Sequence, residues 1–186
     1  DPQWAKQAIA EIQQKGIMLN DVRGFGGNRA VTRGEMAFAL TKLFNLDYGD
    51  IRFIKAPQVS DYYTDVAANS PYAEAIMMCA INNIFESKDR QFKPMAKVTR
   101  IEAAIAINRC FQAKKIEVFT TMMFPMYDDT AKLTSEESAA MSFVSNSGMM
   151  QGDKKRFRLY SPMTRAEAAC LFVKTGKVIE QCASQK

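Results

Sequence analysis

The chain has 186 residues, a hydrophobic content of 47% and a formal net charge of +5 at neutral pH. A chain of this length can bury a substantial core, and its basic excess favours anionic partners without selecting among wall polymers, nucleic acids and membrane surfaces. It contains no histidine, which removes the commonest general base and a favoured metal ligand. It also lacks a Gly-rich phosphate loop, a Cys-x-x-Cys pair and a nucleophile elbow, so we expect no enzyme, cofactor or metal site.

The chain is built from three copies of one unit. The pattern Thr-Arg-x-Glu occurs at Thr32–Glu35, Thr99–Glu102 and Thr164–Glu167, at nearly equal spacing. An aromatic residue precedes each tetrad by the same number of residues, as Phe25, Phe92 and Phe157. A period of this kind indicates a repeat architecture, and we interpret the three phenylalanines as core residues.

Each unit is expected to begin with an amphipathic helix. In the first unit, one helical face consists of Ala5, Ala8, Ile9 and Ile12. The corresponding face of the second unit consists of Tyr72, Ala75, Ile76 and Cys79. The third unit weakens the pattern, because Glu137 takes the first position. Residues suited to the positive φ of a helix C-terminus then follow at Gly16, Asn83 and Gly148.

The tetrad is expected to begin a second helix in each unit. A threonine followed three residues later by glutamate is a capping box, in which each side chain accepts a backbone N–H of the other residue. The following stretches 36–40, 103–107 and 168–173 are apolar on almost every side, which is typical of buried helices. We therefore predict a mainly all-α fold, with three helix-loop-helix repeats forming a pseudo-threefold, three-pronged domain around a central three-helix bundle.

The repeats are predicted to span residues 1–46, 61–113 and 126–180 and to form one compact domain, since about 40 residues rarely fold alone. The connectors at 47–69 and 112–134 are expected to be ordered, with short strands at 51–54 and 116–121. Cys79, Cys110 and Cys170 fall on core positions of the register and are interpreted as buried free thiols. No apolar run approaches the roughly 18 residues of a membrane span, so we expect no membrane insertion.

The tetrad arginines, Arg33, Arg100 and Arg165, each stand in the first turn of a helix, where the macrodipole disfavours a cation. Two explanations remain open. One is an internal ion pair with a carboxylate of the neighbouring unit. The other is an external anion, held by the guanidinium together with free N–H groups at the helix start.

Trp4 is the single tryptophan, and it either covers the edge of the core or stacks on a sugar ring. The acidic pairs Asp61/Asp65 and Asp128/Asp129 do not recur in register and are interpreted as solvated loop acids. Second helices that are apolar on every side also argue against a helix-turn-helix that binds nucleic acid, so no such partner is expected.

The assembled pattern resembles the S-layer homology family. The resemblance rests on Asp1-Pro2-Gln3-Trp4-Ala5, Gly16-Ile17 and Phe25, on Phe92-Lys93-Pro94, and on the three tetrads with the apolar residue before each. The sequence departs from the family pattern at Asn83, in the blurred Asp-Gly pair of the central loops, and in its long connectors.

The resemblance implies a non-covalent cell-wall anchor outside the cell, in the cell wall or S-layer. Grooves between the prongs would bind an anionic, pyruvylated secondary cell-wall polysaccharide through Arg33, Arg100 and Arg165, with Trp4 as a sugar contact. Peptidoglycan is a further possible partner that this resemblance implies. The alternative is a degenerate member of the family that acts as a protein-protein interaction module of a surface protein.

Overall fold

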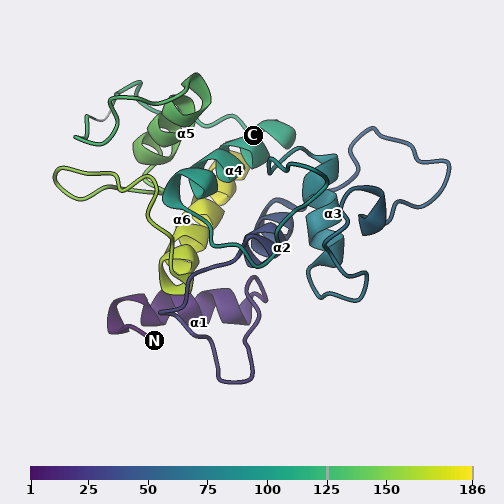
Figure 1. Ribbon diagram of the computed structural model, residues 1–186. Coiled ribbons are helices and arrows are strands. Elements are labelled where there is room, and N and C mark those ends of the chain that lie inside the picture. Colours follow the sequence, from purple (N-terminus) through teal and green to yellow (C-terminus); the bar gives the residue numbers. More distant parts are fainter. Residues whose placement is uncertain (125, 186) are drawn as a thin grey trace.

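The computed structural model describes residues 1–124 and 126–185 and consists of helices joined by loops (Figure 1). The α-helices are α1 (Lys6–Gln14), α2 (Arg33–Phe44), α3 (Ala73–Ile81), α4 (Arg100–Ala113), α5 (Ser135–Asn146) and α6 (Arg165–Ser184). Short 3-10 turns lie at η1 (Gln3–Ala5) and η2 (Val59–Asp61). The predicted mainly all-α class is confirmed.

The prediction of short strands in the two connectors is wrong. Within the described residues, segments 51–54 and 116–121 adopt no strand. A strand needs a neighbour to accept and donate its backbone hydrogen bonds, and the isolated bridges of this fold all lie outside these two segments. β-branched and aromatic residues alone are therefore not sufficient to make a strand here.

Capping boxes begin all three second helices, as predicted. At α2, Thr32 Oγ1 accepts the Glu35 N–H at 3.2 Å, and Glu35 Oε1 accepts the Thr32 N–H at 3.0 Å. The boxes at Thr99 and Thr164 have the same reciprocal bonds. A further capping box at Thr134 begins α5 one turn before the start expected from the register. These bonds satisfy N–H groups that a helix start would otherwise leave unpaired.

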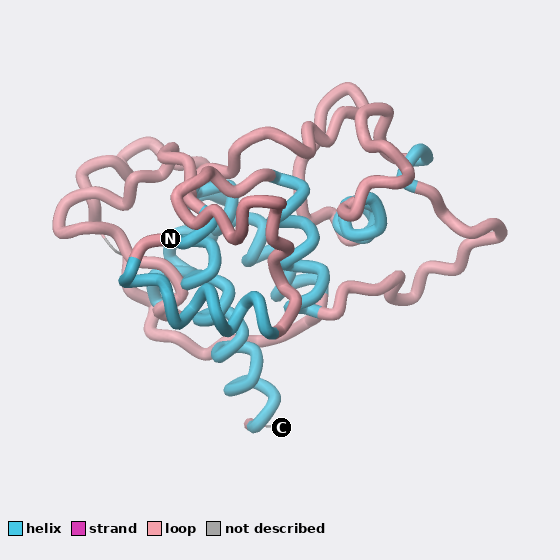
Figure 2. Tube along the Cα trace, turned by 90° about the horizontal axis from the view of Figure 1, so that it is seen from below, coloured by secondary structure: helices cyan, strands magenta, loops and turns pink. Residues whose placement is uncertain are grey.

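Each first helix packs against the second helix of the preceding unit rather than that of its own unit. Helix α3 packs on α2, α5 packs on α4, and α1 closes the cycle by packing on α6. Helix α2 also contacts both α4 and α6. Figure 2 shows the helices gathered at the centre, with long loops projecting at both sides and the end of α6 extending beyond them. The three units are therefore interlocked.

A ring of backbone hydrogen bonds joins the three units where their second helices begin. Val31 donates to the carbonyl of Met163 at 2.9 Å, Val98 donates to Val31 at 3.2 Å, and Met163 donates to Val98 at 2.9 Å. All three residues are buried and each stands directly before a capping threonine. This ring places the starts of α2, α4 and α6 around one pseudo-threefold centre.

The predicted helix ends and the burial of the repeated phenylalanines are confirmed. Positive φ angles of 65°, 56° and 76° occur at Gly16, Asn83 and Gly148. The repeated phenylalanines are buried, with exposed fractions of 3%, 0% and 0%. Cys79 and Cys110 are buried free thiols, whereas Cys170 is free but only partly buried. Among the described helices, none is both long and apolar enough to cross a membrane.

Candidate functional site

The tetrad arginines bind the loop of the next unit in the cycle. Arg33 donates from Nε to the carbonyl of Phe92 at 2.8 Å and from Nη2 to the carbonyl of Glu86 at 2.9 Å. Its guanidinium also lies over the Phe92 ring, 4.7 Å from the centroid. The arginine therefore recognises the repeated phenylalanine of its neighbour by both the main chain and the ring face.

Arg100 and Arg165 repeat this contact. Arg100 donates to the carbonyls of Phe157 at 2.9 Å and Gln151 at 2.7 Å. Arg165 donates to those of Phe25 at 2.8 Å and Leu19 at 2.6 Å. Each guanidinium also lies over the phenylalanine ring. The three arginines thus connect the units in one cyclic order.

The N–H groups at the helix starts are likewise hydrogen-bonded to neighbouring loops. The N–H groups of Arg33 and Gly34 donate to the carbonyls of Ala96 and Pro94, both at 2.9 Å. The first two residues of α4 and of α6 donate in the same way to the loops preceding α6 and α2. These N–H groups are therefore not free to bind an external anion. One explanation for the arginines had expected an anion held by the guanidinium together with free N–H groups, and the second part of that expectation is wrong.

The other explanation for the arginines was an internal ion pair with a neighbouring unit. Carboxylates of the next unit supply such partners for Arg165 and Arg100. Arg165 forms an ion pair with Glu35, and Arg100 Nη1 lies 3.9 Å from Glu167 Oε2. Burial lowers the pKa of Arg33 and the charge of Glu102 partly restores it. Burial, followed by the charge of Arg29, lowers the pKa of the Arg165 guanidinium to about 10, so the group remains charged at neutral pH.

The three arginines differ in their access to solvent. Arg165 has an exposed fraction of 0% and Arg100 of 6%, whereas Arg33 is half-buried. The N-terminal segment lies next to the start of α6, because Asp1 Oδ1 accepts the Gly27 N–H at 2.6 Å and Gly27 in turn accepts the N–H of Ala166. The ligand-binding role of Arg100 and Arg165 stays a prediction.

Arg33 lines a groove of about 640 Å³ between α3 and α5, here named the α3–α5 groove. Residues 84–86 after α3 form one wall and residues 134–137 at the start of α5 form the other. Glu102, Ile105 and Arg109 of α4 complete the lining. Among the described residues, none accepts a hydrogen bond from Arg33 Nη1. The volume falls within the range of about 300–1,000 Å³ typical of small-molecule sites.

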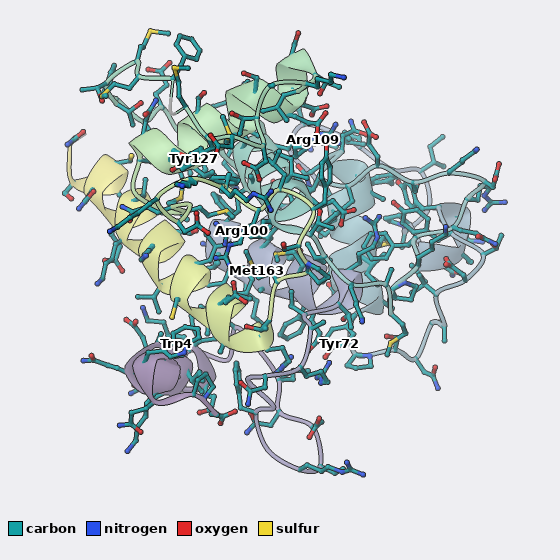
Figure 3. The ribbon with its side chains drawn as sticks, turned by 60° about the vertical axis from the view of Figure 1, so that its left-hand side comes forward. Trp4, Tyr72, Arg100, Arg109, Tyr127 and Met163 are labelled. Carbon is teal, nitrogen blue, oxygen red and sulfur yellow. The ribbon has the colours of Figure 1, made fainter. Side chains whose placement is uncertain are left out.

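The groove is rich in carboxylates. Its lining includes two arginines and four glutamates, namely Arg33, Arg109, Glu86, Glu102, Glu136 and Glu137. Arg109, labelled in Figure 3, donates from Nε to Glu136 at 2.7 Å and from Nη2 to Glu86 at 3.2 Å, and so bridges the two walls. Basic residues stand at the same position of the other two units, Lys42 and Lys174, but the sequence pattern alone predicted no role for Arg109.

A second hollow of about 760 Å³ adjoins this groove. The two share Phe85, Glu86 and Arg109, and the second hollow adds polar side chains of Asn82, Asn83, Ser87 and Gln112. The amide groups can both donate to and accept from a ligand. The two hollows therefore adjoin on one side of α4, with Arg109 in the lining of both.

Trp4 lies at a different place from Arg33. Its exposed fraction is 66%, so it does not cover the core edge. It lines a hollow of about 590 Å³ between α1 and α6 with Gln7, Glu11, Gln14 and Lys177. Figure 3 shows Trp4 beside α6 and far from Arg109. Its role as a sugar contact stays a prediction, and it would belong to a separate subsite.

Two of the acidic residues interpreted as solvated loop acids have a structural role instead. Asp65 accepts the N–H groups of Phe92 and Lys93 at 2.9 and 2.7 Å. Asp129 accepts those of Phe157 and Arg158 at 2.9 and 2.8 Å. Sequence reasoning missed them because they stand one residue out of the common register. Within the described residues, no cluster of three or more His, Cys, Asp or Glu residues could hold a metal ion.

Comparison with known families gives one match. The model of the S-layer homology domain matches residues 1–37 and 62–104, which hold the first two copies of the tetrad. No curated protein matches the chain. The third unit lies outside the matched segments, but it has the same capping box and the same arginine contact. Two segments of the chain therefore match the S-layer homology domain, which is consistent with a chain of such repeats, and domains of this family are cell-surface anchoring modules.

Proposed function

We propose that the chain is an extracellular, non-covalent cell-wall anchor without catalytic activity, which binds pyruvylated secondary cell-wall polysaccharide in the α3–α5 groove. The observation that carries the proposal is the position of Arg33. It is the most exposed of the three tetrad arginines, and it lines a groove between units with one amino group that no described residue engages. A guanidinium is suited to a carboxylate such as that of a pyruvyl group.

The remaining lining suits the uncharged part of a saccharide. Sugar hydroxyls donate to carboxylates, and Glu136 and Glu86 present carboxylates on opposite walls. Ile84 and Ile105 supply apolar surface for the face of a sugar ring. Because the lining contains more carboxylates than guanidinium groups, we expect one acidic sugar at Arg33 followed by neutral sugars, rather than a run of anions.

The same charge balance favours a second candidate ligand, peptidoglycan itself. Its peptide stems carry ammonium groups, which four carboxylates in one groove would attract. The two candidates predict opposite responses to removal of the secondary polymer, so one experiment distinguishes them.

The test is sedimentation of the protein with purified cell-wall sacculi, before and after chemical removal of the non-peptidoglycan polymer. We expect binding to intact sacculi that is lost from stripped ones and is weakened about tenfold by Arg33→Met, the cost of one charge-assisted hydrogen bond. Arg23→Met is the matched control, because this exposed arginine removes the same charge outside the groove. Trp4→Ala tests the separate subsite.

Each contrary result has a defined meaning. Equal binding to stripped and intact sacculi would assign the groove to peptidoglycan. Wild-type affinity in the Arg33→Met variant would refute the role of Arg33. Failure of the wild-type protein to bind either preparation would favour the remaining alternative, a protein-protein interaction module.

A further inference from the structure

We propose that the connector between the second and third units inserts its apolar tip into the interface of an anionic phospholipid bilayer. The apolar tip consists of Met122, Met123, Phe124 and Met126. Their exposed fractions are 89%, 66%, 73% and 95%, and Phe119 before them is 86% exposed. So many large apolar side chains in one short exposed segment indicate an interaction surface.

The apolar tip is held in place from both sides. Asn146 at the end of α5 donates to the carbonyl of Met123 at 2.8 Å. On the other side, the Tyr127 ring packs against Phe157 with centroids 5.6 Å apart, and Asp128 donates to the carbonyl of Lys155 at 2.7 Å. The tip therefore projects from a position that the fold determines.

A strongly basic segment lies beside the tip. The basic loop, residues 153–158, carries four exposed cationic side chains, those of Lys154, Lys155, Arg156 and Arg158. Its single acid, Asp153, accepts the N–H groups of residues 155 and 156. In Figure 1 this loop and the connector project from the same side of the molecule. The corresponding residues of the first two units, 21–26 and 88–93, have fewer basic side chains and likewise a single acid each.

This combination fits a lipid surface better than a peptide or a second copy of the chain. The four tip side chains project into solvent, with exposed fractions of 66% or more. Apolar side chains next to lysine and arginine match the two layers of an anionic bilayer, acyl chains below and negative headgroups above. Shallow insertion needs no spanning helix, so it differs from the sequence-based expectation of no membrane insertion, which rested on the lack of a long apolar run.

The other connector shows what the charge contributes. It also exposes apolar side chains, at Tyr48, Ile51, Phe53 and Ile54. The charges around it are balanced, with Asp47 and Asp50 against Arg52 and Lys55. It therefore offers a matched control, because the same number of apolar side chains can be removed from a segment without a basic neighbour.

The test is co-sedimentation of the whole chain with vesicles of phosphatidylcholine alone or of equal parts phosphatidylcholine and phosphatidylglycerol. We expect binding to the anionic vesicles only, and weaker binding at high salt. Changing the four tip residues to serine should weaken binding by about tenfold or more. Lys154→Ala/Lys155→Ala/Arg156→Ala should also weaken it by about tenfold or more. The serine variant of Tyr48, Ile51, Phe53 and Ile54 should bind as the wild type does.

A fluorescence measurement does not depend on the multiple substitution. With Phe124→Trp in a Trp4→Phe background, the emission should shift to shorter wavelength on addition of anionic vesicles. Several results would overturn the proposal: no binding to anionic vesicles, unchanged binding of the tip variant, or no emission shift. Sedimentation of the vesicle-free protein as a dimer that the tip variant abolishes would likewise overturn it in favour of a second copy.

Discussion

Replacement of the tetrad arginines by methionine should separate their structural role from their binding role. Methionine keeps much of the side-chain volume but removes the charge and the hydrogen bonds. Arg165 is fully buried, donates to two carbonyls and pairs with Glu35. Removing one partner of a buried ion pair costs about 3–5 kcal/mol. Glu35 keeps a second partner, because Arg29 donates to both its oxygens at 3.0 and 3.2 Å. We therefore expect a loss of about 3 kcal/mol for Arg165→Met.

Arg33→Met should cost much less stability. Arg33 is half-buried, so water can reach part of the space that its guanidinium leaves. The net contribution of a hydrogen bond that water can replace is about 1 kcal/mol. The difference of about 2 kcal/mol between the two variants corresponds to a factor of roughly 30 in the unfolding equilibrium constant. Binding to sacculi should follow the opposite order, with Arg33→Met the more impaired variant.

Urea unfolding followed by circular dichroism gives the required free energies, provided that the slope with urea is the same in each variant. Equal losses of stability for Arg33→Met and Arg165→Met would refute this reasoning, because they would mean that burial does not distinguish the two side chains. A folded Arg165→Met variant that loses sacculus binding, with Arg33→Met unaffected, would refute the assignment of the groove.

Three further changes test other parts of the structure. Thr99→Ala removes the capping hydroxyl of α4 and should lower the free energy of unfolding by about 1 kcal/mol, measured by urea titration. Gly152→Ala should cost about 1–3 kcal/mol, since its Cβ would lie 2.6 Å from Cε1 of Tyr127; an unchanged melting temperature would contradict this. Burial raises the pKa of Asp129, but backbone N–H groups outweigh it and hold the pKa below its usual value. Because the folded pKa is the lower one, this carboxylate stabilises the fold above its unfolded pKa of about 3.9 and loses that effect as the pH falls through the folded value. We expect melting temperatures to fall on acidification below about pH 4, and to fall less in Asp129→Asn.

Features that depend on short-range sequence were predictable. The threonine and glutamate of each tetrad lie close enough along the chain to form a capping box whatever surrounds them. The positive φ at Gly16 and Asn83 likewise follows from the local end of a helix. The burial of the repeated phenylalanines followed from their recurrence in three independent copies.

Contacts between different units were not predictable from the sequence. The apolar face of α1 does not reveal that its partner is α6 rather than α2. Three arginines with the same sequence context differ in exposure, and a groove opens beside the most exposed of them, Arg33. Asp65 and Asp129 were missed since their contacts join segments more than twenty residues apart.

The cyclic packing has a consequence for how such modules can be exchanged or shortened. The helices that pack against each other do not belong to the same sequence repeat. Each packed pair consists of the second helix of one unit, the connector, and the first helix of the following unit, as in residues 33–81 or 100–146. Chimaeras joined within the loops that precede the tetrads should preserve these pairs, whereas junctions placed in the connectors would separate α2 from α3 or α4 from α5.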